Sequence, residues 1–457
     1  MRHGRTDPHI ARTKSSKGSP MRSRNSRRSI LLSASAIGVL ALTACSSSGS
    51  GGGGGGGGST GGTTTSANSA PSASVASSKY PPIPAGPIKL GMSLPLSGPY
   101  AVFGESSQTA FTKVALPFFQ KEYPNGIDGH PVELDIQNDA GDSTTAVNVA
   151  NKFVADKIPV VIAPTSIPGA VDQQIAIWNK NKVPVISNYV NEGVYEDGTK
   201  WPYIFTSLNS DKKAGTTAAD WIAGQPDISK LAVLTDGAPA DSAWINYMKQ
   251  ELSAKGSKAT IVKSETVSPG AVDVSTQLSQ LKSANPDLLL VVLAAGYGPV
   301  WDGLHSMNWS PRVVAGETSF YDGYSSIGSL GSTAMAVSSD CLNPGTSVSS
   351  LPANLRQLMD GYAKVEKINN MLIFAHADNV ILELVKYAIE KYHSVDPDAI
   401  KTAMEGIDRS FLWKEFTYHF TPQNHAGAVG HSEQVCKLSP LSDPKYRIPS
   451  AVAGSSS

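Results

Sequence analysis

The sequence predicts an α/β protein with two doubly wound lobes. Short apolar runs alternate with amphipathic segments of helical length, and the alternation restarts after residue 205. The chain also has 457 residues, which is more than one hydrophobic core usually holds. Ligands of such folds bind outside the carboxyl ends of the strands, so we expect binding residues in the loops that follow strands.

The N-terminal segment has the pattern of an export signal. A basic stretch, 22–28, precedes an apolar run over 30–42 that is too short to span a bilayer permanently. The run ends in Leu-Thr-Ala-Cys45, which resembles a bacterial lipobox and implies cleavage before Cys45 and a lipid on its thiol. The alternative is an ordinary signal peptide that contains a cysteine. Met1 and Met21 are both candidate starts, and residues 26–29 partly resemble a twin-arginine signal, which leaves the export route open.

We therefore assign 1–44 to a lipoprotein signal peptide and 45–85 to the lipidated cysteine and a disordered linker. The linker is almost entirely Gly, Ser, Thr, Ala and Pro, and such a composition cannot bury enough apolar surface to become ordered. About forty such residues have a root-mean-square reach of roughly 35 Å, which suits a tether. The last residues, 451–457, are predicted to form a disordered tail.

Charge and cysteine content limit the possible partners. The formal net charge is zero, so nothing in the charge favours nucleic acid. Cys341 and Cys436 remain after Cys45; an oxidising compartment favours a disulfide between them, and two buried free thiols are the alternative. We predict no metal and no cofactor, because no Cys or His cluster has ligand spacing.

The elements follow in order. In the first lobe we expect strands over 88–94, 132–136, 160–163 and 183–187, with helices over 105–122 (disturbed at Pro117), 143–156 and 170–182. In the second we expect strands over 230–236, 259–267, 288–293 and 312–315, with helices over 241–255, 276–284 and 300–307. A helical stretch over 376–392, a helix from 397 and strands over 416–420 and 434–438 complete the pattern.

The loop after the strand over 160–163 is the first candidate binding loop. It holds Thr165 and Ser166 just before a helix, whose free N–H groups favour an anion such as a carboxylate. The alternative is that Ser166 only caps the helix.

Three landmarks together indicate a family. They are 95–104 (PLSGPYAVFG), 162–166 with 183–187, and 420–427 (FTPQNHAG). With the lipobox and the linker, the chain resembles the type I extracytoplasmic solute-binding lipoproteins of ABC transporters, in the branch that binds leucine, isoleucine and valine. The resemblance covers roughly 88–438. It implies a Venus flytrap of two lobes joined by a three-crossover hinge: 86–206 plus 340–418, and 207–339 plus 419–450.

The resemblance also implies a set of ligand-binding positions: Phe103, Thr165, Ser166, Asn188, Tyr189, Asn191, Tyr297 and Glu317. Ser166, with the backbone around Thr165, would grip a carboxylate, and Glu317 would pair with an α-amino group. The physical reason is that both charges of a zwitterion must be paired when it leaves water.

Each position also has a structural interpretation. Glu317 could be an exposed loop carboxylate, and Tyr297 and Phe103 could pack between the lobes. Asn188 and Asn191 could only stabilise a turn.

The loop over 188–191 is bulkier than in the family, Ile167 replaces a small hydroxyl residue, and 238–241 replaces a Tyr-Gly pair. These differences predict a carboxylate-bearing ligand with a polar or aromatic side chain rather than leucine, isoleucine or valine.

The predicted function is the substrate-binding subunit of an ABC importer that captures an amino acid or related small carboxylate. Its expected partners are that ligand, an ABC permease and ATPase complex, and the membrane through a lipid anchor. An enzyme is not expected, because the folded body has no nucleophile elbow, Walker loop, zinc motif or dinucleotide motif. The alternative is a ligand-sensing receptor lobe for a membrane signalling partner, since the same fold serves both tasks.

Overall fold

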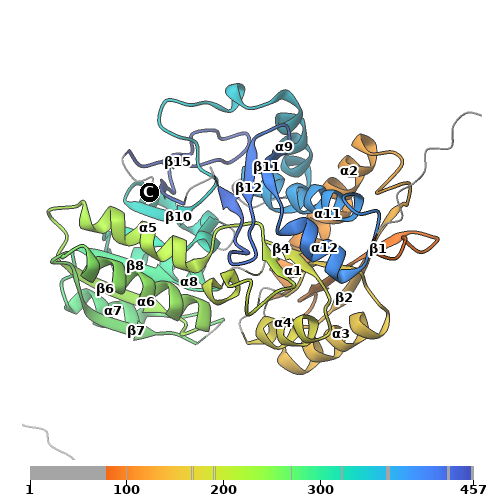
Figure 1. Ribbon diagram of the computed structural model, residues 1–457. Coiled ribbons are helices and arrows are strands. Elements are labelled where there is room, and N and C mark those ends of the chain that lie inside the picture. The colour runs from red at the N-terminus through yellow and green to blue at the C-terminus, as the bar shows by residue number, and fades with distance from the viewer. Residues whose placement is uncertain are drawn as a thin grey trace, which may run out of the picture. The chain divides into compact units, whose positions relative to one another are not determined.

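Two largely parallel sheets form the framework of the protein in the computed structural model (Figure 1). The structure describes residues 79–98, 100–165, 167, 169–188, 190, 192–268, 270–320, 323–366, 371–429 and 433–453. The predicted signal peptide, Cys45 and most of the predicted linker lie outside the described residues, as do Ser166, Tyr189 and Asn191. Within these ranges, no helix has the length and apolar character needed to cross a membrane.

The first sheet has the strand order β2-β1-β3-β4-β5, and all its strands are parallel. They are β1 (Ile88–Leu94), β2 (Val132–Asn138), β3 (Val160–Ala163), β4 (Val185–Ser187) and β5 (Ile204–Thr206). Every residue of β3 is buried, as expected for a strand covered on both faces. Val160 and Ile162 pack into one core while Val161 packs into the other, because successive side chains point to opposite faces.

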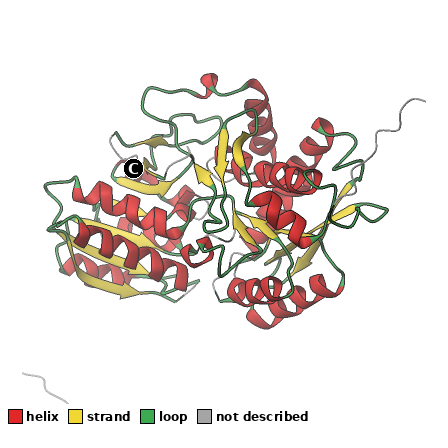
Figure 2. Ribbon diagram, viewed as in Figure 1, coloured by secondary structure: helices red, strands yellow, loops and turns green. Residues whose placement is uncertain are grey.

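Helices cover both faces of this sheet (Figure 2). One face packs against α3 (Ser143–Ala155) and α4 (Ala170–Lys180). The other packs against the N-terminal and late helices. These are α1 (Ala101–Ala110), the π-helical turn η1 (Phe111–Ala115), α2 (Leu116–Glu122), α9 (Ala353–Val365), α10 (Met371–Phe374), the π-helical turn η7 (Ala375–Asn379), α11 (Val380–Glu390) and α12 (Pro397–Met404).

The second sheet has the order β15-β14-β10-β9-β8-β6-β7. Its parallel strands are β6 (Lys230–Thr235), β7 (Thr260–Thr266), β8 (Leu288–Val292), β9 (Val313–Ala315) and β10 (Ala334–Ser338), and β14 (Gln434–Lys437) and β15 (Ser450–Ala451) are antiparallel. Leu231 and Val233 pack against α5 (Asp211–Ala223) and α6 (Pro239–Ala254). Ala232 and Leu234 pack against α7 (Ser275–Ser283) and α8 (Tyr297–Ser306) on the other face.

A buried polar network ties together the three chain segments that pass between the sheets. His376 Nδ1 lies 3.2 Å from Asp340, which follows β10, and His376 Nε2 lies 2.7 Å from the Tyr418 hydroxyl. Tyr418 belongs to a small sheet of β11 (Asp408–Phe411), β12 (Phe416–His419) and β13 (Ala428–Val429), and its hydroxyl donates to Ser207 O at 2.9 Å, just after β5. These contacts connect the three segments of the predicted hinge.

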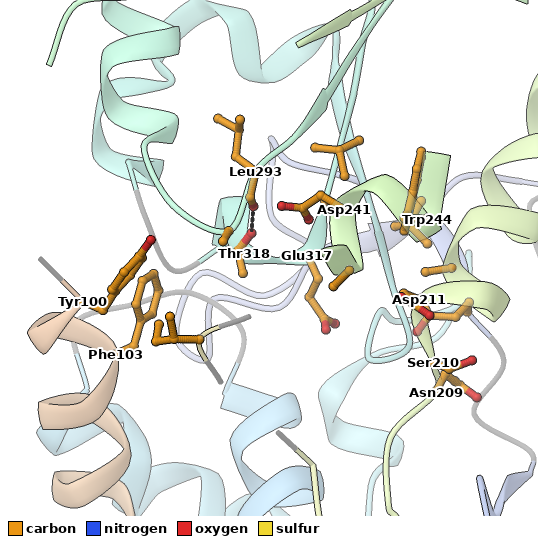
Figure 3. Close-up of a pocket in the computed structure, with 18 residues that line it drawn as sticks. Tyr100, Phe103, Asn209, Ser210, Asp211, Asp241, Trp244, Leu293, Glu317 and Thr318 are labelled. Carbon is orange, nitrogen blue, oxygen red and sulfur yellow. Dashed lines mark hydrogen bonds between the residues drawn. The ribbon is translucent and has the colours of Figure 1, made fainter. Parts of the chain in front are cut away.

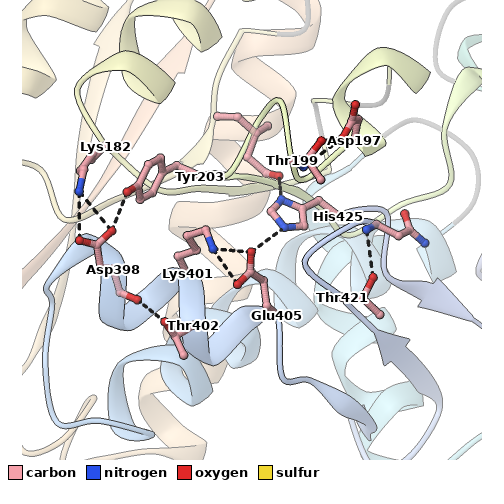
Figure 4. A network of polar contacts seen from close by, with 12 residues as sticks. Lys182, Asp197, Thr199, Tyr203, Asp398, Lys401, Thr402, Glu405, Thr421 and His425 are labelled. Carbon is pink, nitrogen blue, oxygen red and sulfur yellow. Dashed lines mark hydrogen bonds and ion pairs between the residues drawn. The ribbon is translucent and has the colours of Figure 1, made fainter. Parts of the chain in front are cut away.

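The landmark over 420–427 docks against the first sheet (Figure 4). The buried His425 ring contacts Ile204 O of β5 through Nδ1 at 2.8 Å and Glu405 through Nε2 at 3.3 Å, and Lys401 pairs with Glu405 at 2.6 Å. Thr206 N donates to His425 O at 3.0 Å. Residues 420–427 are thus bound to β5, the edge strand of the first sheet.

A disulfide joins Cys341, after β10, to Cys436 of β14, with Cα atoms 6.3 Å apart. Of the two alternatives that the sequence left open, the structure has the paired form. The bond connects segments 95 residues apart in the chain.

Several predicted boundaries differ from the structure. The helix predicted over 105–122 begins at Ala101 and contains a π-helical turn immediately before α2, where Pro117 occupies the first turn. No pattern predicted β10 or α5. Residues of the predicted linker and tail are packed: Tyr80 contacts the Tyr392 ring, and Ala451 is buried in β15.

The packing of residues after β14 also differs from the predicted lobe boundaries. Tyr446 and Ile448, placed in the second lobe by the sequence, are buried in the core of the first. The segment after β14 therefore contributes to both lobes.

Candidate functional site

A cavity of about 190 Å³ lies at the carboxyl ends of strands from both sheets (Figure 3). This is many times the about 10–15 Å³ that one water requires on the same measure. The first lobe contributes Tyr100, Phe103 and Ile167. The rest of the lining is Asn209, Ser210, Asp211, Ala214, Ala240, Asp241, Trp244, Val292, Leu293, Ala294, Gly316, Glu317, Thr318, Val337 and Glu433.

The position of the cavity follows from the strand order. In the first sheet the order reverses between β1 and β3, and Tyr100 and Ile167 lie in the loops after these two strands. In the second it reverses between β6 and β8, and Asp241 and Ala294 follow them. Ligands of open α/β sheets bind at such points, so the cavity is the candidate binding site.

Glu317 lies in the cavity wall, as the resemblance implied. It opens the short turn η3 (Glu317–Phe320) directly after β9, and its Oε1 accepts a hydrogen bond from Ser338 Oγ at 2.7 Å. Burial raises the pKa of Glu317 to about 7, and the nearby Asp340 charge adds to this effect. A cation in the cavity would favour the ionised form, so the site suits an ammonium group.

Phe103 also lines the cavity, from the first turn of α1, next to Tyr100. Burial raises the pKa of Tyr100, with further contributions from the charges of Asp236 and Asp241. Asp236 and Asp241 belong to the second lobe, so Tyr100 of the first lobe lies close enough to the second for their charges to act on it.

Tyr297 is fully buried behind the lining rather than in it. Its hydroxyl donates to Val291 O at 3.2 Å and accepts from Gly316 N at 3.2 Å and Leu293 N at 3.3 Å. These bonds join the loops after β8 and β9, including the one that carries Glu317. Tyr297 therefore positions the wall from the core of the second lobe, and it neither lines the cavity nor packs between the lobes.

Thr165 and Asn188 do not line the cavity either. Thr165 is fully buried, and its Oγ1 accepts a weak hydrogen bond from Ile167 N at 3.4 Å. Asn188 has a buried side-chain oxygen without a hydrogen-bond partner among the described residues. Because Ser166, Tyr189 and Asn191 lie outside the described residues, their predicted roles stay predictions.

Sequence reasoning missed most of the acidic wall. Asp211, Asp241 and Glu433 line the cavity together with Glu317, and Trp244 lies beside them. A signal was present: Asp211 and Asp241 fall in the first turns of helices that follow β5 and β6, where the strand-end rule places ligand contacts. Glu433 had no comparable signal, because it precedes an antiparallel strand.

Comparison with known proteins agrees with the landmarks. The model of the periplasmic binding protein family matches residues 87–427. Leu/Ile/Val-binding protein homolog 1 of Brucella suis is 27% identical over 218 residues, 48% of this chain and 54% of that protein, so the chain spans about half the length of this relative. Leu/Ile/Val-binding protein BraC3 of Rhizobium johnstonii is 24% identical over 72% of this chain and 87% of its own length.

Solved structures share the fold. A periplasmic binding protein type 1 from Bordetella pertussis superposes with a TM-score of 0.65 at 18% identity, covering 77% of this chain and 96% of that one. A solute-binding protein from Rhodopseudomonas palustris in complex with benzoate gives 0.65 at 15% identity, covering 81% and 97%. The two-lobed α/β fold class predicted from the sequence is confirmed. The chain belongs to the periplasmic binding protein family, with the type I fold, and this membership implies an extracytoplasmic location.

Proposed function

We propose that the chain is the substrate-binding subunit of an ABC importer and not an enzyme. It holds an amino acid or related small carboxylate between its lobes and delivers it to a membrane permease. The observation that carries this proposal is a cavity lined from both sheets at the carboxyl ends of their strands, with Glu317 in its wall. Relatives named for binding leucine, isoleucine and valine support the ligand class.

The mechanism follows from the two-sided lining. A ligand that contacts Phe103 and Tyr100 of the first lobe and Glu317 of the second stabilises the arrangement in which both walls meet it. Its ammonium group would pair with Glu317. Its carboxylate would lie near Ile167, in the loop that carries Thr165 and Ser166 before α4.

The first test is thermal unfolding of the purified chain with a panel of amino acids, amides and small aromatic acids. A ligand at a hundredfold its Kd adds about 2.7 kcal/mol to the free energy of unfolding, which is easily seen as a higher melting temperature. Glu317→Gln should weaken the response, while Glu133→Gln, exposed on β2, should not. Absence of any stabilising ligand would contradict a binding function.

Delivery to a permease requires that the chain stay near the membrane, and we propose a lipid on Cys45 for this purpose. Labelled palmitate should enter the wild-type chain and not a Cys45→Ser variant. In cells, loss of the chain should abolish uptake of the ligand found above. Binding without any effect on uptake would favour the alternative, a receptor lobe for a signalling partner.

A further inference from the structure

Four carboxyl groups line one side of the cavity, more than a single ammonium group needs. Asp211 lies in α5, Asp241 in α6 and Glu317 in η3 (Figure 3). Glu433 lies just before β14. Because four separate segments supply them, they are not the capping set of one helix. Among the described lining residues, none is lysine, arginine or histidine.

Three of these carboxylates have a buried oxygen without a hydrogen-bond partner among the described residues: Asp211, Asp241 and Glu433. Asp211 is 6% exposed; its Oδ1 accepts from Gly193 N at 2.6 Å, and its Oδ2 has no hydrogen-bond partner among the described residues. Glu433 is 5% exposed, and its Oε2 is likewise without a partner there. A buried carboxylate oxygen without a donor is costly, so these atoms are suited to a donor that arrives with the ligand.

Charges within the wall act on one another. After burial and the larger effect of Asp236, the charge of Asp211 also raises the pKa of Asp241, and after burial the charges of Glu317 and Asp340 raise the pKa of Glu433. Burial is the largest cause that raises the pKa of each, to about 6 for Asp211 and well above the usual range for Asp241 and Glu433. Lys213 offsets part of this effect at Glu433, although it is outside the lining.

An organic cation fits this wall better than a metal ion. In the part of the chain that the structure describes, no three His, Cys, Asp or Glu side chains are grouped so that they could hold a metal. The rest of the lining includes the rings of Tyr100, Phe103 and Trp244. Aromatic faces accept both alkyl chains and organic cations.

We propose that the ligand is a small organic dication, with one ammonium or guanidinium group held between Asp211 and Asp241 and a second between Glu317 and Glu433. This inference rests on the proposed function and narrows its ligand class. A basic amino acid and a diamine without a carboxylate share this chemistry.

The test is isothermal titration calorimetry of the purified chain with arginine, lysine, agmatine and putrescine as dications, and with leucine, valine and benzoate as comparison ligands. At least one dication should bind at least tenfold more tightly than every comparison ligand. Binding at pH 7 should release protons, seen as a dependence of the measured heat on the ionisation enthalpy of the buffer. Preference for the amino acids over agmatine and putrescine would identify the carboxylate-bearing source.

Variants distinguish a loss of charge pairing with the ligand from a general loss of folding. Asp211→Asn and Glu433→Gln should each weaken dication binding at least tenfold while the protein still unfolds cooperatively. Glu366→Gln is the matched control: Glu366 is 6% exposed and also has an oxygen without a partner among the described residues, but it lies outside the cavity lining. It should bind as the wild type does.

The two proposals fail in different ways. Binding of leucine, valine or benzoate as tightly as any dication would overturn the dication inference and leave the binding function standing. Failure of every panel member to bind would overturn both.

Discussion

At the scale of single residues, the cavity carboxyl groups destabilise the ligand-free fold at neutral pH. Burial raises the pKa of Asp211 from 3.8 to about 6, so the folded state holds a proton that the unfolded state has released. Stability from this group is present below pH 4 and is lost as the pH rises through about 6. Asp211→Asn keeps an acceptor for Gly193 N and removes the charge. We expect it to raise the free energy of unfolding at pH 8 by about 1–3 kcal/mol.

Urea unfolding at pH 4.5 and pH 8 measures this effect. The gain of Asp211→Asn should be small at the lower pH and full at the higher one. Asp302→Asn, exposed on α8, is the control and should change neither value. A gain that is equal at both pH values would show that the charge of Asp211 is not its cause.

His425 has the opposite pH dependence. Burial lowers its pKa below 6.5, against smaller effects of Ile204 O and Glu405 that raise it. The unfolded chain therefore takes up a proton first, and stability is lost as the pH falls below about 6.5. In denaturant titrations, the stability advantage of wild type over His425→Gln should shrink between pH 7 and pH 5. An advantage that stays constant between pH 7 and pH 5 would show that protonation of His425 does not contribute.

Whether a cavity residue could be predicted depended on how local its sequence pattern was. Phe103 and Glu317 both line the cavity: Phe103 lies in the landmark over 95–104, and Glu317 comes two residues after the predicted strand over 312–315. Tyr297 looked equally well placed, but its ring turns into the core, and the direction of a side chain on a helix depends on packing that no motif records. Asp211, Asp241 and Glu433 meet only through long-range folding, so their convergence was not visible in the sequence.

At the scale of elements, the disulfide joins β14 to the segment that leaves β10. Its 95-residue separation closes a long loop, which limits the freedom of the unfolded chain. We expect the double variant Cys341→Ser, Cys436→Ser to lose about 2–5 kcal/mol of unfolding free energy in urea titrations. Alkylation of the denatured, non-reduced wild type should modify neither cysteine, and modification of both would contradict the bond.

Elements with a strong local pattern were predictable, and those without one were not. β3 and β8 are continuous apolar runs, as expected of strands buried on both faces, and both formed as predicted. β10 reads Ala-Met-Ala-Val-Ser and follows a Gly- and Ser-rich stretch, so its strand state comes from pairing with β9 and β14 rather than from propensity. α5 was not predicted because polar residues interrupt the apolar pattern of its buried face.

At the scale of the whole molecule, Tyr418 links the segments that pass between the lobes. Its hydroxyl donates to Ser207 O and contacts His376 Nε2, all in a buried setting. Tyr418→Phe removes both bonds, and we expect it to lower the unfolding free energy by about 1–3 kcal/mol, measured by chemical denaturation. Tyr387→Phe is the control, since its half-buried ring lies on α11 away from this network. An equal loss in both variants would argue against a special role for the hinge.

The late arrival of the chain end has a consequence for protein synthesis. β14 covers the free edge of β10 but is synthesised later. The core between the first sheet and the late helices includes Tyr446 and Ile448, which are synthesised later still. At roughly 5–20 residues per second, the ribosome needs about 5–20 s to add the residues between β10 and β14. During that interval the cores that include β14, Tyr446 and Ile448 are incomplete, so we expect the nascent polypeptide not to reach its final fold. A polypeptide in that state can still be threaded through a membrane pore before it folds.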